Sequence, residues 1–303
     1  MYQNIVYHTI HNDTLSKLFM KITVISKDSP WSIHELKKSS KKHNIPLEVR
    51  DFFPNDTSLE NLGEVVLWRS SSLGKSSLRI QLMRKIAKNH ILINPSLITY
   101  PKVAEKFFQQ LFIKENLPHI NTIPTFQFSS KEDLLASLEE KILSYPFICK
   151  PNLGSKGQNI SKINNIQDIM QLPFSLKNLV FQNFIENTGD YRVLILGKEV
   201  LGIIKRKSNK RSFLNNVSQG GSAEHITNAV KIKKLSSIAL EVSSAFHLLF
   251  CGVDIIFDEK QKKYFFLEIN TIPQWQGFQS ATKIPVAEKC ILYAQKIFAN
   301  TSS

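Results

Sequence analysis

The chain has 303 residues, of which 42% are hydrophobic and 21% are charged. These values are typical of a folded globular protein and exclude a disordered chain, and the length predicts more than one lobe. The most apolar stretch, residues 238–257, contains Glu241, His247 and Asp254. Because these side chains would be costly in hydrocarbon, no membrane span is expected. The net charge of +14 indicates an acidic partner without choosing its class.

The cysteines and the N-terminus indicate a cytoplasmic protein. Cys149, Cys251 and Cys290 lie in apolar surroundings, without metal-type spacing and in odd number. This pattern argues against a disulfide framework and predicts buried, reduced thiols. Residues 1–19 lack the continuous apolar core of a secretory signal. Because the first sheet is expected to begin at Lys21 and residues 1–19 have no strong amphipathic pattern, we expect them to form an arm that is dispensable for folding.

The first third of the chain predicts an open parallel sheet. Strand-like runs and helix-like stretches alternate here as in βαβ units. The strands are expected at 21–26, 47–52, 65–69 and 91–94, and the helices at 31–43 and 76–89. An α/β domain over residues 20–104 follows from this alternation.

Two α+β lobes are expected beyond that domain. In the central lobe, residues 105–185, Ser130 and Asp133 have the spacing of a helix N-terminus. The C-terminal lobe, residues 186–303, predicts two hairpins. One hairpin turns at Gly197-Lys198 and the other turns within 259–263.

The second hairpin carries the clearest chemical signal. With its turn centred on Gln261 and no bulge, Asp254 faces Glu268, and Asn270 shares their face. The other face would carry Val253, Ile255, Phe257, Phe265, Leu267 and Ile269. Two carboxylates about 5 Å apart repel by roughly 3 kcal/mol at an effective dielectric near 20, so positive charge is expected between them. Two carboxylates and an amide suit Mg²⁺ better than Zn²⁺. A solvated acidic edge with a neighbouring lysine is an equally good interpretation of this hairpin alone.

A short glycine-containing loop follows the strand that ends in Lys150. Its sequence is Gly154-Ser155-Lys156-Gly157. The backbone N–H groups of such a loop can fold over phosphates, although an ordinary surface turn has the same composition.

An ordered set of motifs resembles the RimK-type ATP-grasp ligases, a group similar to glutathione synthases and ribosomal-protein glutamate ligases. The resemblance covers nearly everything from Met20 onward, and the order of the motifs is more specific than any one of them. In chain order they are Glu105-Lys106, the LP…PT spacing of 117–125, Lys150-Pro151, GSKG at 154–157, VFQNFI at 180–185, DYR at 190–192, Lys205-Arg206, Asn216 with Gly220-Gly221, GVD at 252–254 and LEIN at 267–270.

The resemblance implies an α/β protein of the ATP-grasp fold, with an N-terminal open parallel sheet domain and two α+β lobes enclosing ATP. Asp254, Glu268 and Asn270 would hold Mg²⁺, with two ions expected and Mn²⁺ as an alternative ion. The nucleotide site would comprise Lys106, Lys150, Gly154, Ser155, Lys156, Gly157, Gln182, Asn183, Phe184 and Asp190. Asn159 stands where many relatives have another lid glycine and, like glycine, it tolerates left-handed geometry.

The implied reaction forms ADP. A substrate carboxylate attacks the γ-phosphate of ATP, and an amine captures the resulting acyl phosphate. Arg192, Arg206 and Asn216 match family positions near the reacting groups. A regular register about Gly197-Lys198 puts the two arginines on opposite faces of the sheet. Either a bulge intervenes or only one of them enters the site.

The substrates stay open at this stage. Leu214 and Gln219 fall where the ribosomal-protein glutamate ligases have arginines, so glutamate specificity is not carried over. An amino acid, a peptide or an acidic protein is expected, and a homo-oligomer is left open. The alternative is a non-catalytic ATP-binding module of the same fold that binds an acidic partner. Nucleic-acid binding rests on charge alone and is not favoured, and Trp275 is expected to be a packing residue.

Overall fold

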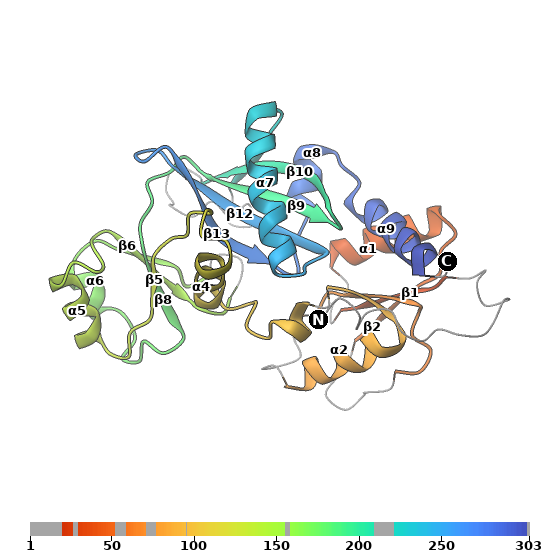
Figure 1. Ribbon diagram of the computed structural model, residues 1–303, viewed down its shortest axis with the longest axis horizontal. Coiled ribbons are helices and arrows are strands. Elements are labelled where there is room, and N and C mark those ends of the chain that lie inside the picture. The colour runs from red at the N-terminus through yellow and green to blue at the C-terminus, as the bar shows by residue number, and fades with distance from the viewer. Residues whose placement is uncertain are drawn as a thin grey trace.

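The computed structural model describes residues 20–26, 30–51, 59–70, 77–94, 96–154, 158–208 and 221–301. The N-terminal arm, residues 1–19, lies outside this part of the chain. Three sheets follow one another in sequence: the N-terminal and central sheets lie at opposite ends of the molecule, and the C-terminal sheet lies between them (Figure 1).

The N-terminal sheet is parallel, as the sequence predicts, with strand order β2-β1-β3-β4. Its strands are β1 (Ile22–Ile25), β2 (Leu47–Arg50), β3 (Val65–Trp68) and β4 (Ile91–Ile93). Helix α1 (Trp31–Lys42) packs on one face and α2 (Ser77–Asn89) on the other, with the short α3 (Ser96–Thr99) following β4 (Figure 1). Because both faces are covered, β1 and β3 are buried at every position.

The central sheet is antiparallel, with order β5-β8-β6-β7. Its elements are β5 (Thr125–Phe126), α5 (Lys131–Glu139), β6 (Phe147–Pro151), β7 (Ser161–Ile163), α6 (Ile166–Met170) and β8 (Leu179–Asn183), and α4 (Lys106–Asn116) precedes them. The predicted helix start is confirmed, because Ser130 and Asp133 form a reciprocal capping box. That helix ends at Glu139, and Lys141 takes a left-handed conformation two residues later.

The C-terminal sheet is also antiparallel, with order β11-β10-β9-β12-β13. Its strands are β9 (Asp190–Leu196), β10 (Glu199–Lys207), β11 (Ser222–His225), β12 (Phe250–Asp258) and β13 (Lys263–Asn270). Helix α7 (Ala229–Ala245) covers one face. Helices α8 (Gln276–Thr282) and α9 (Val286–Thr301) join the other face to the N-terminal sheet through a shared apolar core.

The hairpin of β12 and β13 pairs Asp254 with Glu268, as predicted, but the prediction of a bulge-free register is wrong. A bulge at Leu267 separates the pair Asp254 and Glu268 from the pair Ile255 and Phe266. Gln110 on α4 holds this bulge by donating from Nε2 to the carbonyl oxygens of Phe266 and Leu267, at 3.1 and 2.9 Å.

Between the turn and Asp254, the bulge changes which side chains of β13 lie on the face beneath α7. The prediction that Phe265 and Leu267 share a face with Val253 is wrong, because both side chains pack with Ile256 instead. Phe266 takes their expected place in the core beneath α7. One inserted residue reverses every side chain that follows it, because neighbouring side chains alternate between faces.

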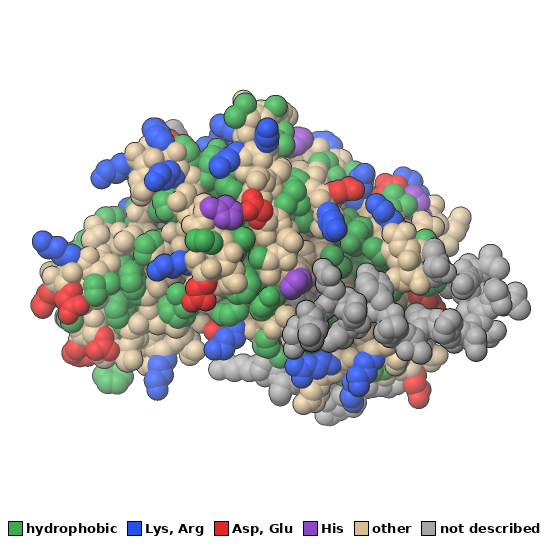
Figure 2. Space-filling view, viewed as in Figure 1, with side chains coloured by type: hydrophobic (Ala, Val, Ile, Leu, Met, Phe, Trp, Pro, Cys, Tyr) green, Lys and Arg blue, Asp and Glu red, His purple; other side chains and the backbone are tan. Residues whose placement is uncertain are grey.

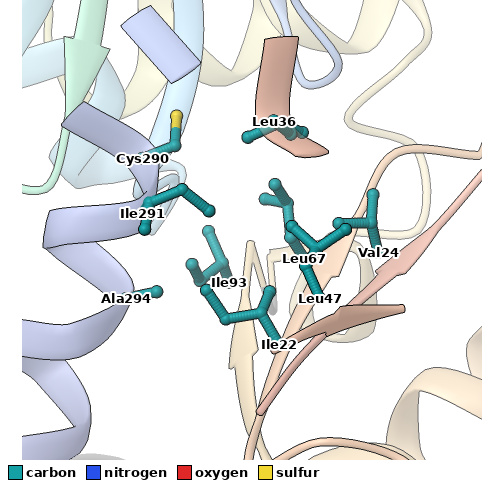
Figure 3. A pocket seen from close by; sticks show the side chains of 9 residues that line it. All are labelled: Ile22, Val24, Leu36, Leu47, Leu67, Ile93, Cys290, Ile291 and Ala294. Atoms are coloured by element: carbon teal, nitrogen blue, oxygen red, sulfur yellow. The ribbon is translucent and has the colours of Figure 1, made fainter. Parts of the chain in front are cut away.

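The cysteines behave as expected. Cys149, Cys251 and Cys290 are buried free thiols, and burial raises the pKa of Cys149 and of Cys290 to about 12. Cys290 lines a small apolar cavity of about 10 Å³ between α9 and the N-terminal sheet (Figure 3). The lining offers a bound molecule no charged group, so this cavity is a packing defect and not a candidate site. None of the helices in the described ranges is long and apolar enough to cross a bilayer.

Candidate active site

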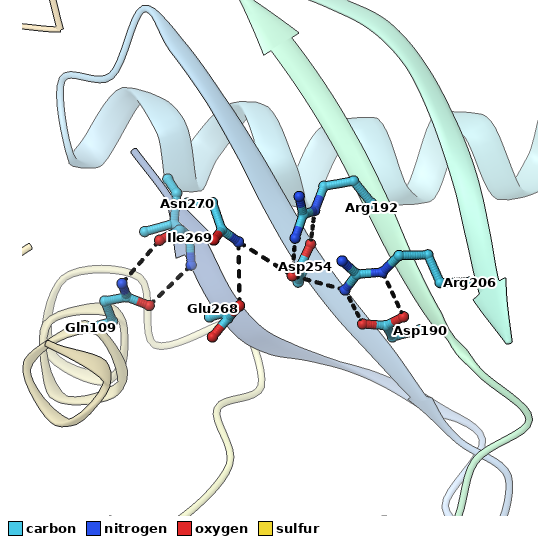
Figure 4. Close-up of polar contacts among 8 residues, drawn as sticks. All are labelled: Gln109, Asp190, Arg192, Arg206, Asp254, Glu268, Ile269 and Asn270. Carbon is cyan, nitrogen blue, oxygen red and sulfur yellow. Dashed lines mark hydrogen bonds and ion pairs between the residues drawn. The ribbon is translucent and has the colours of Figure 1, made fainter. Parts of the chain in front are cut away.

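Four charged side chains meet on one face of the C-terminal sheet (Figure 4). Arg192 donates from Nε to Asp254 Oδ1 and from Nη2 to Asp254 Oδ2, the second bond at 2.7 Å. Arg206 donates from Nη2 to Asp254 Oδ2 at 2.9 Å, and from Nε to Asp190 Oδ1 at 2.9 Å. A further bond joins Arg206 Nη2 to Asp190 Oδ2. The cluster holds two positive and two negative groups, so its charges balance.

A second bulge brings the two arginines together. The register between β9 and β10 shifts between Val200 and Gly202, so that Arg192 pairs with Ile204 and Arg206 pairs with Asp190. Both arginines therefore lie on the same face, which confirms the bulged alternative. Neither arginine is excluded from the site.

The cluster is held out of water. Asp254 is only 1% exposed, and Asp190 and Arg206 are also buried. Although burial alone would raise the pKa of Asp254, the charges and hydrogen bonds of Arg192 and Arg206 hold that pKa below its usual value. Despite burial, the neighbouring carboxylates raise the pKa of Arg206. Asp254 and Arg206 are therefore charged at neutral pH, whereas burial raises the pKa of Asp190 despite the opposing charge and hydrogen bonds of Arg206.

Glu268 and Asn270 lie beside this cluster on β13. Asn270 Nδ2 donates to Asp254 Oδ2 and to Glu268 Oε1, both at 3.3 Å. The strand is fixed between these side chains by Gln109 of α4, whose amide exchanges two hydrogen bonds of 3.0 Å with the backbone of Ile269 (Figure 4). No sequence pattern marks Gln109, since a glutamine that is buried in a helix cannot be distinguished in the sequence from a glutamine on the surface.

The oxygen atoms of Asp254, Glu268 and Asn270 suit a hard divalent cation. The described residues contain no group of three or more His, Cys, Asp or Glu side chains placed to hold a metal, so the amide is a necessary part of this set. Asp254 already accepts bonds from both arginines, yet each carboxylate oxygen has a second lone pair to offer. Glu268 forms no ion pair within the described ranges. The donor set fits Mg²⁺, with Glu268 as the ligand free of competing charge.

The electrostatic reason for expecting a metal is weaker than the sequence suggested. Asp254 and Glu268 are paired across the strands, as that argument required. However, Arg192 and Arg206 already supply the positive charge that was expected between the two carboxylates, through their ion pairs with Asp254. The chemistry of the oxygen donors, and not the repulsion between them, supports the metal site.

Two buried lysines lie close to one another at the start of α4 and on β6, and Lys150 lies near the acidic group. Lys106 begins α4 and is 7% exposed, and Lys150 lies on β6 and is 5% exposed. Lys106 Nζ donates to the carbonyl oxygen of Gly154 at 3.0 Å. Burial, reinforced by the charge of Lys106, lowers the pKa of Lys150 to about 8, and the charges of Glu268 and Asp254 oppose that change. No hydrogen bond to Lys150 Nζ is found within the described residues.

The predicted adenine-side residues lie on and just after β8. Gln182 pairs with Thr125 on one side and Ile148 on the other, and its Nε2 donates to Thr125 Oγ1 at 2.6 Å. The N–H of Phe184 donates to Pro146 O at 3.1 Å, so the carbonyl of Phe184 is its remaining backbone group. Lys162 Nζ lies 3.8 Å from the centre of the Phe184 ring.

Several predicted residues lie outside the described part of the chain. Outside it lie Ser155, Lys156 and Gly157 of the loop, and also Asn216. Leu214 and Gln219 are also outside. Within the described residues, Asn159 has a φ of 55°, which confirms the left-handed geometry expected there.

Comparison with known proteins agrees with this arrangement. Residues 84–294 match the family model for the RimK-like ATP-grasp domain. Coenzyme gamma-F420-2:alpha-L-glutamate ligase of Methanococcus maripaludis is 26% identical over 279 residues, which cover 86% of this chain and 93% of that protein. Tetrahydromethanopterin:alpha-L-glutamate ligase of Methanocaldococcus jannaschii is 25% identical over 300 residues, which cover 90% and 97%.

Solved structures show the same fold at lower identity. The ATP-grasp ligase PsnB, complexed with a phosphomimetic variant of its minimal precursor, Mg and ADP, superposes with a TM-score of 0.66 and 14% identity, over 90% of this chain and 98% of that chain. The family model spans far more than half of the present sequence, including every strand of the central and C-terminal sheets. The chain therefore belongs to the RimK-like ATP-grasp family, and it is an ATP-dependent carboxylate-amine ligase.

Proposed function

We propose that this ligase joins an ATP-activated carboxylate to the amino group of an anionic amino acid, with L-glutamate as the first to test. Two relatives that match nearly the whole chain are alpha-L-glutamate ligases. The net charge of +14 favours an anionic substrate. Because Leu214 and Gln219 depart from the arginines of the ribosomal-protein enzymes, other acidic amino acids and peptides are the alternatives.

One observation carries this proposal. Lys150 is a buried residue, no ion pair of its ammonium group is found among the described residues, and it lies near the carboxylates of Glu268 and Asp254. Placing a cation in a buried residue is unfavourable, and the phosphate groups of ATP would supply the missing anionic partner. Lys106 begins a helix nearby, where backbone N–H groups also favour negative charge.

We assign the metal to Asp254, Glu268 and Asn270, with two Mg²⁺ ions or, alternatively, Mn²⁺. When bound, Mg²⁺ would neutralise the negative charge of the phosphate oxygens during transfer. Arg192 holds the Asp254 carboxylate in position, and Asp190 orients Arg206.

Arg206 has a direct role in the proposed reaction. Its bonds to the two aspartates use Nε and Nη2, which leaves Nη1 to stabilise the negative charge on the oxygens of the transferring phosphoryl group. Arg192 and Asn216 are assigned to the same reaction centre. The acyl phosphate forms when the substrate carboxylate attacks the γ-phosphate and displaces ADP. The amine then attacks the acyl carbon, loses a proton and displaces phosphate.

The remaining nucleotide contacts follow the family resemblance. The loop of Gly154, Ser155, Lys156 and Gly157 would cover the phosphates, and the stretch from Gln182 to Phe184 would contact adenine. We also propose lobes at residues 20–104, 105–185 and 186–303, each containing one of the three sheets. The buried free thiols are in keeping with a cytoplasmic location.

The basic charge does not favour a nucleic-acid partner. On the face shown in Figure 2, Lys and Arg side chains are scattered and do not gather in one patch. The face in view therefore lacks the continuous basic track that a nucleic-acid backbone requires.

The direct test is ADP release from ATP and Mg²⁺ with L-glutamate and a panel of carboxylate partners, including amino acids and short acidic peptides. L-Glutamine, whose side chain carries no charge, serves as the comparison for L-glutamate. ADP release that requires both L-glutamate and a carboxylate partner supports the proposal. ATP binding without ADP release in every combination would instead favour the non-catalytic module, and preference for L-glutamine would overturn the anionic specificity.

A further inference from the structure

The carboxyl edge of the N-terminal sheet has the topology of a ligand site. Strands β1 and β3 are neighbours. The chain leaves β1 through α1 on one face toward β2, and it leaves β3 through α2 on the other face toward β4 (Figure 1). The direction of winding therefore reverses between β1 and β3. In open α/β sheets such a reversal opens a crevice at the carboxyl ends of the two strands, where ligands bind.

Unpaired buried polar groups gather at this edge. Four buried side-chain atoms in the described part of the chain lack a hydrogen-bond partner: Ser32 Oγ, Arg69 Nη1, Arg79 Nε and Trp275 Nε1. Ser32 and Arg79 lie in the first turns of α1 and α2, which follow β1 and β3. Arg69 is the residue directly after β3, and Trp275 packs against it. All four atoms can donate a hydrogen bond, so the edge is short of acceptors.

Arg69 is the most unusual of these groups. It is 7% exposed, and no carboxylate forms an ion pair with it within the described ranges. Its guanidinium carbon lies 4.2 Å from the centre of the Trp275 ring, and its Nη2 donates to Pro273 O at 3.2 Å. Burial lowers the pKa of Arg69 to about 10, so the group is still a cation at neutral pH. A buried cation whose Nη1 has no acceptor is costly unless an anion completes it.

This edge is continuous with the proposed metal site. Asn94, directly after β4, donates from Nδ2 to Thr271 O at 3.0 Å, and Thr271 follows the proposed metal ligand Asn270. Pro273, which accepts from Arg69, is three residues beyond Asn270. A ligand that reaches Arg69 would therefore lie along the chain segment that leaves the metal-binding strand.

We propose that Arg69 and Trp275 bind a carboxylate of the amino-acid substrate, with Arg69 Nη1 and Trp275 Nε1 donating to its two oxygens. The proposal rests on the proposed function, since it specifies where that function's anionic substrate is held. A planar guanidinium beside an indole N–H matches a planar carboxylate.

The test compares wild type with Arg69→Gln, Arg69→Lys and Trp275→Phe. Arg84→Gln is the matched control, because Arg84 is an exposed arginine on α2. Binding is measured without ATP, as the rise in melting temperature produced by L-glutamate, with L-glutamine and inorganic phosphate at matched ionic strength as comparison ligands. The KM values for L-glutamate and for ATP are measured beside it.

We expect L-glutamate to stabilise wild type and Arg84→Gln, and to stabilise Arg69→Gln little or not at all. Arg69→Lys should retain part of the effect, because it keeps the charge and loses the planar fork. Trp275→Phe, which keeps an aromatic ring and removes one donor, should weaken L-glutamate binding by about threefold to tenfold. In Arg69→Gln the KM for L-glutamate should rise by at least about tenfold while the KM for ATP stays within about twofold.

Three results would overturn the proposal: no stabilisation of wild type by L-glutamate, equal stabilisation of wild type and folded Arg69→Gln, or stronger Arg69-dependent stabilisation by phosphate. If Arg69→Gln fails to fold, unchanged L-glutamate binding by Trp275→Phe overturns it. The proposed function fails separately. If L-glutamate binding depends on Arg69 but no ADP is released, the subsite is supported and the proposed reaction is rejected. If ADP is released and the KM for L-glutamate is unchanged in Arg69→Gln, the reaction is supported and the subsite is rejected.

Discussion

Arg192 on β9 holds both carboxylate oxygens of Asp254 on the neighbouring strand β12, and Arg206 adds a bond of 2.9 Å to one of them. Asp254 pairs directly with Arg192 in the register of the two strands. The negative charge of this buried aspartate is therefore balanced by the protein itself. Asp254 supports the sheet as well as the proposed metal site.

Replacing Asp254 should therefore damage both stability and activity. Asp254→Asn keeps the side-chain shape but leaves two arginines beside a single remaining aspartate, Asp190. We expect the free energy of unfolding to fall by about 3 kcal/mol, a typical cost of breaking a buried pair. Urea denaturation measures the change. Glu224→Gln, at an exposed ion pair on the same sheet, should leave the unfolding midpoint unchanged. An Asp254→Asn protein as stable as wild type would contradict this role.

Lys150→Met should stabilise the free protein and impair nucleotide binding. Burial lowers the pKa of Lys150 from 10.5 to about 8, so its positive charge destabilises the fold. Removing the charge is expected to raise the free energy of unfolding at neutral pH by up to about 3 kcal/mol, from roughly 1.4 kcal/mol per pKa unit. ATP affinity should fall by at least about tenfold. Lys177→Met, at an exposed lysine in the turn before β8, is the control and should change neither property.

The same lysine predicts a pH dependence. In the free protein, Lys150 loses its proton as pH rises through about 8, and ATP binding should weaken above that pH. The unfolded chain keeps this proton up to about pH 10.4, so the destabilising contribution of Lys150 to folding is relieved between those two values. Titration calorimetry from pH 6.5 to 9.5 follows the dissociation constant for ATP. The decline should be absent in Lys150→Met, and an identical decline in that variant would assign the titration to another group.

The predictions made from the sequence succeeded where the signal was local. The parallel strands of the first sheet follow from alternating apolar runs, and the Ser130 helix start follows from one capping motif. The pairing of Asp254 with Glu268 was also right, although its assumed register was not. The real turn is centred half a residue earlier, and the bulge at Leu267 restores the pair.

The bulge could not be found from the hairpin alone. It is held by Gln110, which lies more than 150 residues earlier in the chain. The same limit applies to Arg69 and Trp275, which lie in different parts of the sequence and meet only in the folded protein. Trp275 does pack in the core as predicted, but its contact with a buried cation has no local sequence signal.

Asn94 is expected to fasten the N-terminal sheet to the rest of the protein. Its Nδ2 donates to Phe250 O and Thr271 O, and its Oδ1 accepts from the N–H groups of Leu249 and Phe250. Asn94→Ala leaves these buried backbone groups without partners and should lower the free energy of unfolding by about 2–4 kcal/mol.

The backbone of Asn94 is left-handed, with a φ of 69°, so alanine also adds strain. Asn94→Gly removes the side chain without that strain and separates the two effects. Thermal and urea unfolding of both variants give the comparison. If Asn94→Gly were as stable as wild type, the side-chain bonds would contribute nothing to the attachment of this sheet.

Glu268→Gln tests the central claim, that ATP is activated between the buried lysines and the oxygen donors of β13. The substitution keeps shape and removes the charge of the carboxylate that has no ion pair within the described residues. We expect kcat for ADP formation at saturating Mg²⁺ to fall by about two orders of magnitude or more, with a smaller change in ATP affinity. The melting temperature in chelator should stay close to that of wild type, since Arg192 and Arg206 already neutralise Asp254. Wild-type turnover in Glu268→Gln would contradict the metal assignment, and a collapsed melt would make Glu268 a structural residue instead.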